Sequence, residues 1–187
     1  MESIIAYFES LSTLSEQSKE LLSDLIEEEY YGKGDIIQEI GSSCKTIYFI
    51  TDGVARIFYF KDGQDITEHF AFDSHIIIRA ESLFREEATA KGIQALTALK
   101  LIKINAAALF ALFDLQSDIE RLFYKIITNE YLSLTKRVEE LQIYTATERY
   151  YELLKQTTLV NEIPLKYIAT YLGITHVSLS RIRAGIK

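Results

Sequence analysis

Residues 165–183 read Leu165-Lys-Tyr-Ile-Ala-Thr-Tyr-Leu-Gly-Ile-Thr-His-Val-Ser-Leu-Ser-Arg-Ile-Arg183, a pattern typical of two helices joined by a tight turn. Pro164 stands just before the first helix, where its missing N–H removes no helical hydrogen bond. Ala169 is small where a second helix must cross closely, and Gly173 stands where the turn needs a left-handed residue. Thr175 is a natural N-cap for the second helix. Together these signals predict a helix-turn-helix.

The apolar positions of this segment agree with two crossed helices. Such helices turn five side chains inward: Ile168, Leu172, Ile174, Leu179 and Ile182. The outward face of the second helix is short, polar and basic, as a recognition helix needs in order to reach base edges in the major groove. We therefore expect DNA contacts from Thr175, His176, Val177, Ser178, Ser180, Arg181, Arg183 and Lys187.

The expected roles of these residues differ. Arg181 is suited to bridge two acceptors of a guanine, while Arg183 and Lys187 are expected to contact phosphates, which position a protein without specifying sequence. Thr175, Ser178 and Ser180 suit either bases or phosphates. The alternative is a three-helix packing module that binds a protein partner instead of DNA.

Charge is unevenly placed along the chain. The 187 residues carry a net charge of −7, yet residues 145–187 hold six basic and three acidic side chains. This tail is therefore +3, which leaves −10 for residues 1–144. A mildly basic tail behind an acidic body suits DNA binding at one end of the molecule.

A long helix is predicted to begin near Ser117, ahead of this tail. Its apolar side chains are separated by 3, 4, 3, 4 and 3 residues, which is the spacing of a two-stranded coiled coil. We expect a dimer interface along this seam. The alternatives are that the stripe covers the chain's own barrel, or that one face of the helix serves each purpose. The seam consists of Tyr124, Ile127, Tyr131, Leu134, Val138 and Leu141.

Short β-type runs occupy much of the first half of the chain. They recur at the spacing of an antiparallel barrel or jelly roll, with Asp52-Gly53 and Asp62-Gly63 as hairpin signals. The runs are 35–40, 46–50, 54–60, 66–72, 92–96 and 100–104. Residues 2 to about 29 are predicted to be helical, with a second helix starting at Ser12 or Thr13. Asn105 is a candidate N-cap for a short helix that ends at Phe113.

The fold class is therefore α+β. We expect an N-terminal antiparallel β-roll with flanking helices at residues 1–116, a long dimerisation helix at 117–143 and a helix-turn-helix domain at 144–187. Thr145 or Thr147 is expected to cap the first helix of that last domain. Residues 158–163 are expected to add a short strand at most, so no full wing is predicted.

Composition excludes several other classes. The chain is 48% hydrophobic and 25% charged, as is ordinary for globular proteins, and shows neither a membrane-length apolar run nor a secretory signal. We expect a cytoplasmic protein. The single cysteine, Cys44, excludes an intrachain disulfide and a multi-thiolate metal site. Three scattered histidines and no nucleophile–base pair argue against an enzyme, so no catalytic residue, metal or cofactor is predicted.

Two segments carry a resemblance to a known family. The run from Gly41 to Arg56, which ends Tyr48-Phe-Ile-Thr-Asp-Gly53-Val-Ala-Arg56, resembles the cyclic-nucleotide-binding β-roll of the bacterial Crp/Fnr regulators. Leu172-Gly-Ile-Thr175, followed by Leu179-Ser-Arg181-Ile, resembles that family's recognition-helix region. The resemblance implies a homodimer on a two-fold symmetric DNA site that recruits or blocks RNA polymerase.

The resemblance also places an effector pocket at Arg79, Glu81, Lys91 and Gly92. Relatives that bind cyclic AMP hold its phosphate with Gly-Glu and then Arg followed by Ser or Thr, whereas this chain has Ala80-Glu81 and Lys91-Gly92. Lysine offers a point charge instead of a bidentate fork, and glycine offers no hydroxyl. We therefore expect a regulator that responds to another small effector or to none. The alternative function is a ligand-binding module whose C-terminal helices bind a protein.

Overall fold

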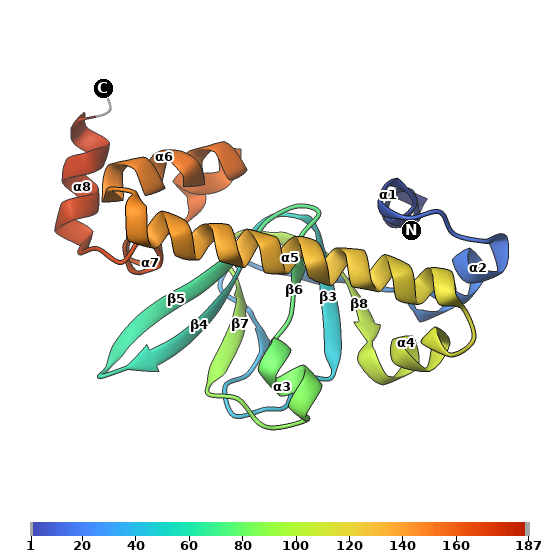
Figure 1. Ribbon diagram of the computed structural model, residues 1–187. Coiled ribbons are helices and arrows are strands. Elements are labelled where there is room, and N and C mark those ends of the chain that lie inside the picture. Colours follow the sequence, from blue (N-terminus) through green and yellow to red (C-terminus); the bar gives the residue numbers. More distant parts are fainter. Residues whose placement is uncertain (1, 186–187) are drawn as a thin grey trace.

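The computed structural model describes residues 2–185. Two four-stranded antiparallel sheets face each other as a β-roll, with strand orders β1-β8-β3-β6 and β2-β7-β4-β5. This architecture confirms the predicted fold class (Figure 1). The strands are β1 (Glu27–Tyr31), β2 (Ile36–Gln38), β3 (Thr46–Asp52), β4 (Ala55–Lys61), β5 (Gln64–Ala71), β6 (Ile76–Ile77), β7 (Lys91–Ala95) and β8 (Leu99–Asn105).

The two Asp-Gly pairs behave differently. Asp62 and Gly63, with φ of 51° and 76°, close a two-residue hairpin between β4 and β5, in which Lys61 pairs with Gln64. This confirms one hairpin. The other prediction was wrong, because β3 and β4 belong to different sheets and the Asp52-Gly53 turn crosses between them. Gly53 has a φ of 98°, and a Cβ there would lie 2.4 Å from the Ala98 carbonyl oxygen, so this crossing requires glycine.

The N-terminal helices are shorter than predicted. They are α1 (Glu2–Leu11) and α2 (Glu16–Leu25), and Ser15, not Ser12 or Thr13, caps α2 by accepting a hydrogen bond from the Ser18 N–H. Residues 27–29, expected to be helical, belong to β1 because this segment pairs with β8. Lys103 and Lys100 of β8 form ion pairs with the β1 glutamates. Tertiary pairing therefore overrides local helix preference here.

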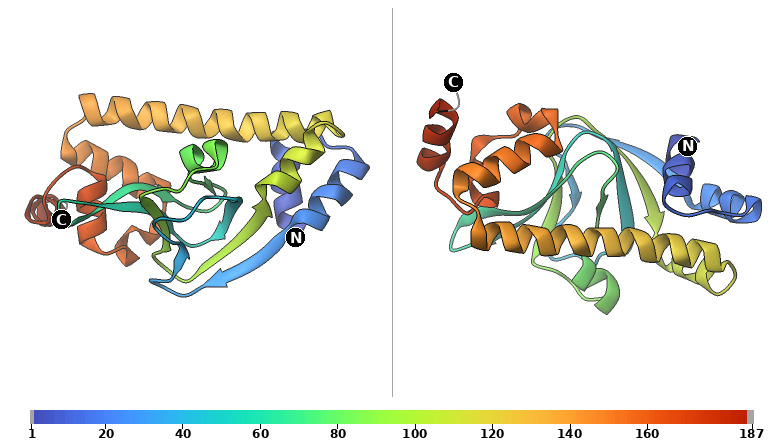
Figure 2. Two further views of the ribbon diagram at one scale, coloured as in Figure 1. Left: turned by 90° about the horizontal axis from the view of Figure 1, so that it is seen from below. Right: turned by 45° about the horizontal axis from the view of Figure 1, so that its top comes forward.

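Helix α5 (Ser117–Ile143) runs along the whole molecule, with the β-roll on one side of it (Figures 1 and 2). It follows α4 (Ala106–Phe113), which Asn105 caps as predicted. The first half of α5 packs against the β-roll and the N-terminal helices through four buried residues: Ile119, Leu122, Phe123 and Ile126. A short helix, α3 (Ala80–Arg85), lies near the middle of α5.

The C-terminal helices form a small cluster at the far end of α5. They are α6 (Ala146–Gln156), α7 (Leu165–Tyr171) and α8 (His176–Gly185). Thr145 caps α6 in a reciprocal capping box with Glu148. The strand expected at 158–163 was wrong, because residues Thr158–Glu162 form a 3₁₀ helix, η1. Among residues 2–185, no helix is both long and apolar enough to cross a membrane.

Candidate nucleic-acid interface and effector cavity

Helices α7 and α8 form the predicted helix-turn-helix. Gly173 holds a φ of 69° in the turn, and the Thr175 side chain accepts a hydrogen bond from the Ser178 N–H at 3.1 Å. Ile168, Leu172 and Leu179 are at most 1% exposed, while Ile174 and Ile182 are partly buried against the same cluster. The inward face predicted from the sequence is therefore confirmed.

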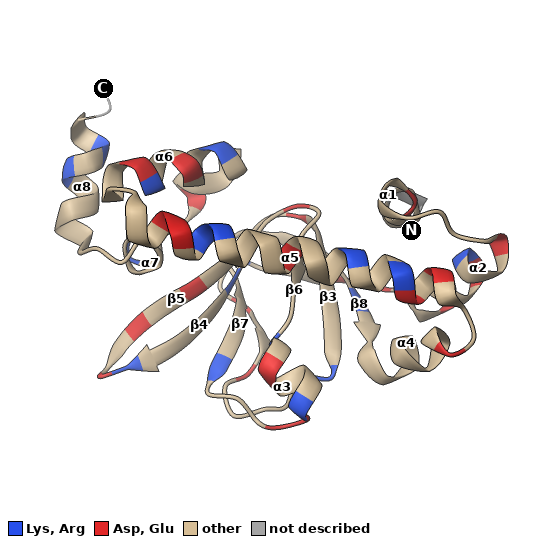
Figure 3. Ribbon diagram, viewed as in Figure 1, with Lys and Arg blue, Asp and Glu red and all other residues tan. Residues whose placement is uncertain are grey.

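The outward face of α8 is solvent-exposed. Thr175, His176, Val177, Ser180 and Arg181 are all exposed. Among Lys, Arg, Asp and Glu, the described part of this helix carries two arginines alone, Arg181 and Arg183 (Figure 3). The structure thus gathers five of the expected DNA-contact residues on one free surface.

Three of the expected contacts lie differently. The Ser178 hydroxyl is 2.9 Å from the Thr175 hydroxyl, so it contributes to the cap. Arg183 is partly buried and donates a hydrogen bond to Asn161 Oδ1 at 2.9 Å. Lys187 lies outside the described residues. Arg181 is therefore the exposed arginine on the described part of α8.

The predicted coiled-coil seam lies mostly on the open side of α5. Five of its six residues are 43–69% exposed: Tyr124, Tyr131, Leu134, Val138 and Leu141. Ile127 differs, because it is partly buried against the core formed by the β-roll and the N-terminal helices. One face of α5 thus covers the barrel, while another exposes an apolar stripe.

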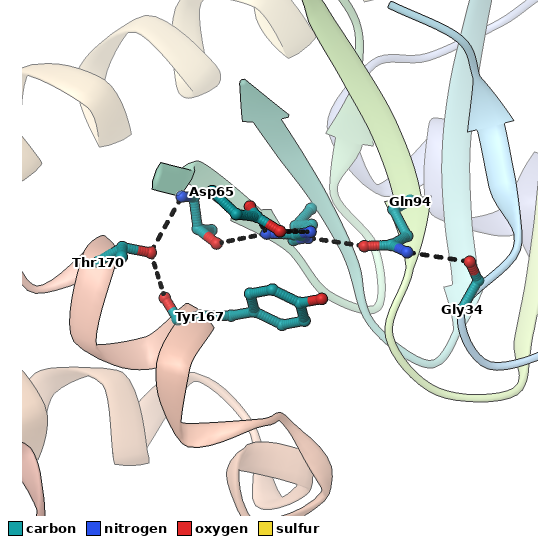
Figure 4. Close-up of polar contacts among 7 residues, drawn as sticks. Gly34, Asp65, Gln94, Tyr167 and Thr170 are labelled. Atoms are coloured by element: carbon teal, nitrogen blue, oxygen red, sulfur yellow. Dashed lines mark hydrogen bonds and ion pairs between the residues drawn. The ribbon is translucent and has the colours of Figure 1, made fainter. Parts of the chain in front are cut away.

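The helix-turn-helix packs on the β-roll through what we call the Arg56 cluster: Arg56, Asp65, Thr67, Tyr167 and Thr170. Arg56, 1% exposed, donates to both Asp65 carboxylate oxygens at 2.6 and 2.8 Å. Its guanidinium carbon lies 3.5 Å from the centroid of the Tyr167 ring of α7. The Thr67 N–H of β5 donates to Thr170 Oγ1 at 3.1 Å (Figure 4).

A second contact joins α5 to the same unit. Arg137 donates to the Tyr171 carbonyl oxygen at 2.7 Å, and its guanidinium carbon lies 3.5 Å from the centre of that ring. The sequence reasoning missed these contacts. Its only available signal was Arg56 itself, a charged residue inside an apolar strand, which is rarely buried without partners.

A cavity of about 310 Å³ lies between the β-roll, α3 and α5, and we call it the α5 cavity. Arg79, Glu81 and Lys91 line it, as expected for an effector pocket. Gly92 is not among its lining residues: it is buried, and a Cβ there would lie 2.7 Å from the Phe58 ring. The role of Gly92 in this structure is therefore to let β7 pass Phe58.

The charged groups around the α5 cavity already have partners within the chain. Arg79 donates to the Lys91 carbonyl oxygen and to the Thr89 hydroxyl. Lys91 Nζ lies 2.7 and 2.6 Å from the two carboxylate oxygens of Glu68. Glu81 is largely exposed and pairs with Arg85 at 3.3 Å. Lys91 is thus paired with a carboxylate, whereas the hydrogen-bond partners of Arg79 are neutral oxygens.

Two further titratable groups line the same cavity. Burial raises the pKa of Glu130 to about 7, although a hydrogen bond with the Ile76 backbone opposes this shift. Burial lowers the pKa of His69 to about 4, with the Arg137 charge as a second cause. Near neutral pH the His69 ring is therefore uncharged, and Glu130 is close to half protonated. Among residues 2–185 no cluster of His, Cys, Asp or Glu has metal-site geometry.

The sequence of the β-roll matches that of a known family of domains. Residues 28–116 match the family model of the cyclic nucleotide-binding domain. No curated protein sequence matches the chain.

Several solved structures share the fold. FixK2 from Bradyrhizobium japonicum superposes with a TM-score of 0.72 at 16% identity, covering 86% of this chain and 84% of FixK2. A Eubacterium rectale protein assigned to the Crp/Fnr family gives 0.70 at 19% identity, over 92% and 83% of the two chains. CLP from Xanthomonas campestris, described as a c-di-GMP-responsive global regulator, gives 0.68 at 15% identity, over 92% and 91%. Residues 28–116 thus form a domain of the cyclic nucleotide-binding family, and the chain has the fold of Crp/Fnr-type regulators.

Proposed function

We propose that this protein is a homodimeric, sequence-specific DNA-binding transcription regulator, in which α8 enters the major groove. One observation carries the proposal. The apolar side of α8 is buried, while Thr175, His176, Ser180 and Arg181 project from its free side without a neighbouring acidic residue on that helix. Hydroxyl, imidazole and guanidinium groups on one helix face are suited to base edges and phosphates.

The α5 stripe supports a two-fold arrangement. An exposed apolar stripe with heptad spacing favours a parallel helix pair, and a symmetric dimer presents two copies of α8 to two half-sites. The expected operator is therefore an inverted repeat, with half-sites separated by about one helical turn or a multiple of it. The regulators that share this fold support the same class of function.

The test is fluorescence-anisotropy titration of DNA selected from a random pool. We expect a symmetric site to be enriched and its affinity to fall steeply with added salt. Arg181→Ala should weaken binding to that site by roughly 10–100-fold and relax its base preference. Arg121→Ala, which removes an exposed arginine from α5, is the matched control and should bind within about twofold of the parent.

Two outcomes oppose the proposal. If no sequence is enriched at any salt concentration, the C-terminal helices bind something other than a specific DNA site, and a protein partner becomes the better assignment. If Arg181→Ala and Arg121→Ala weaken binding equally, the interaction is charge attraction without readout by α8.

A further inference from the structure

A separate cavity lies where the β-roll and the second half of α5 meet the C-terminal helices, and we call it the junction cavity (Figure 1). Its volume of about 190 Å³ is below the usual range for drug-sized ligands and suits a smaller molecule. It shares His69 and Leu134 with the α5 cavity, but none of Arg79, Glu81 and Lys91 lines it. Four elements contribute to its lining, among them through His69 and Phe70 of β5, Lys136 and Arg137 of α5, Gln156 of α6 and Tyr171 of α7.

The lining of the junction cavity carries a positive charge. Lys136 and Arg137 contribute two positive charges and Glu140 one negative charge, which leaves +1. His69 and His75 also line the cavity, but burial lowers the pKa of both rings, that of His69 to about 4, so both are mainly uncharged near neutral pH. The cavity therefore favours a single negative charge, while Glu140 would repel a dianion.

The guanidinium of Arg137 is incompletely compensated. Its contacts with Tyr171 are to uncharged groups: the carbonyl oxygen at 2.7 Å, and the ring, whose centroid lies 3.5 Å from the guanidinium carbon. Burial lowers the pKa of Arg137 and the Arg149 charge lowers it further, while Tyr171 and Glu140 oppose this shift without offsetting it. An anion would therefore stabilise the charged form of Arg137, and the planar guanidinium is suited to bind both oxygens of a carboxylate.

The remaining lining is partly apolar and open to solvent. The ring centroids of Phe70 and Tyr171 lie 4.6 Å apart, and Leu134 adds an aliphatic side chain. Ser133 and Gln156 provide a hydroxyl and an amide, and both residues are exposed, so a ligand can enter from water. A small molecule with an apolar body and one anionic group matches these walls.

We propose that the junction cavity binds a small monocarboxylate with an apolar body, whose carboxylate is directed to Arg137. A molecule bound there would contact β5, α5, α6 and α7 together, so it would stabilise one placement of the helix-turn-helix on the β-roll. The inference rests on the proposed function only in treating the ligand as an effector of DNA binding. Ligand binding itself requires neither DNA nor a functional α8.

The test is isothermal titration calorimetry of the intact protein at pH 8. The probes are two carboxylates, butyrate and benzoate, and their uncharged amides, butyramide and benzamide. We expect at least one carboxylate to bind saturably and at least tenfold more tightly than its amide. Inorganic phosphate, which is mainly a dianion at this pH, should not displace it. The proposal is wrong if neither carboxylate binds saturably, if the amides bind as tightly as the carboxylates, or if phosphate displaces the bound carboxylate.

Variants then locate the bound carboxylate. Arg137→Gln removes the guanidinium and should weaken binding at least tenfold, whereas Arg121→Gln, at an exposed arginine of α5 outside the lining, should leave it within twofold. Because Arg137 also contacts Tyr171, Ser133→Phe provides an independent check. Ser133 is exposed, so a ring at this position should obstruct the cavity without disturbing the core and weaken binding at least tenfold. Binding that survives both Arg137→Gln and Ser133→Phe, or equal losses in the two arginine variants, would refute the assignment.

Lys91→Met distinguishes the junction cavity from the α5 cavity. Lys91 lines only the latter of these two, so its loss should leave the carboxylate affinity within twofold. A tenfold loss would place the carboxylate in the α5 cavity and contradict the proposal. These results are independent of the DNA titrations: a protein that binds the carboxylate but no DNA would retain this inference and lose the proposed function, and one that binds DNA but no carboxylate would do the reverse.

Discussion

Gly173 holds a backbone conformation that other residues adopt only with strain. Its φ is 69°, and a Cβ added there would meet no atom within 4 Å, so any penalty comes from the backbone alone. We predict that Gly173→Ala lowers the free energy of unfolding by about 1 kcal/mol. Gly185 lies in α8, also with open space around a new Cβ and without a positive φ.

Gly185→Ala is therefore the matched control, and it should be neutral or stabilising by up to about 1 kcal/mol. Urea unfolding followed by far-UV circular dichroism measures both variants. Equal effects of the two substitutions would show that the turn does not depend on a left-handed residue.

Glu130 is the second residue for which we predict a measurable effect, here on how stability depends on pH. Its pKa is raised from the ordinary value of 4.5 to about 7 in the folded protein. Below pH 4.5 the group is protonated in both states and has no effect on stability. Between about pH 4.5 and 7 the unfolded chain ionises first, so the native state loses relative stability, and above pH 7 the full penalty remains.

We therefore predict that Glu130→Gln gains stability over the parent at pH 8 but not at pH 4.5. The gain should reach about 2 kcal/mol, a value that allows for partial solvent screening. The low pKa of His69 also makes stability depend on pH, but His69 is present in both proteins and largely cancels in the difference. Thermal unfolding of both proteins across this pH range gives the comparison, and a difference independent of pH would argue against a raised pKa.

At the scale of the element, α5 presents different side chains to the barrel and to solvent. Val138 belongs to the exposed stripe. Leu132 is 58% exposed, and because successive helix residues are rotated by about 100°, it lies on another side of the helix. We predict that Val138→Glu dissociates the dimer, because it buries a carboxylate in an apolar helix pair.

Leu132→Glu introduces the same charge at a comparable exposure and should leave the dimer intact. Analytical ultracentrifugation at micromolar concentrations distinguishes the two states. A monomeric parent protein, or equal dissociation of both variants, would remove the stripe from the dimer interface.

At the scale of the whole molecule, the Arg56 cluster joins the C-terminal helices to the β-roll. Tyr167 covers the Arg56 guanidinium and Thr170 accepts from the Thr67 N–H, so both contacts belong to the interface between these two parts. A buried cation–π contact contributes up to about 2 kcal/mol and a hydrogen bond about 1 kcal/mol. The parent should therefore unfold in one calorimetric transition.

We predict that Tyr167→Leu combined with Thr170→Val separates this transition into two, with the C-terminal helices melting first. Tyr151→Leu, at an exposed tyrosine of α6, is the control and should keep a single transition. A single transition with an unchanged midpoint in the double variant would show that the interface does not couple the two parts.

Whether a structural feature could be predicted depends on how far apart in the sequence the residues that determine it lie. The Asp62-Gly63 hairpin, the Asn105 cap and the Gly173 turn were all correct, and Thr145 was one of the two caps expected for α6, since each depends on residues within about four positions. The inward face of the helix-turn-helix was also correct, because helical periodicity assigns it without knowledge of other elements.

Signals that depend on distant partners failed. The Asp52-Gly53 turn crosses between sheets instead of closing a hairpin, and residues 27–29 are strand because β8 pairs with them. In the expected effector pocket, the residue types of Arg79 and Lys91 were visible in the sequence, but the hydrogen bond of Arg79 to Thr89 and the ion pair of Lys91 with Glu68 were not. Gly92 serves close packing against Phe58, which no local pattern reveals.

The sequence by itself determined the Asp62-Gly63 hairpin, the Asn105 cap, the Gly173 turn and the polar face of α8. These follow from backbone preferences and side-chain periodicity, which act over a few residues. Only the tertiary structure decided that Arg56 holds the C-terminal helices on the β-roll, and that Lys91 beside the α5 cavity is paired with Glu68. A charge's partner and a cavity's polarity depend on which distant segments the packed core brings together.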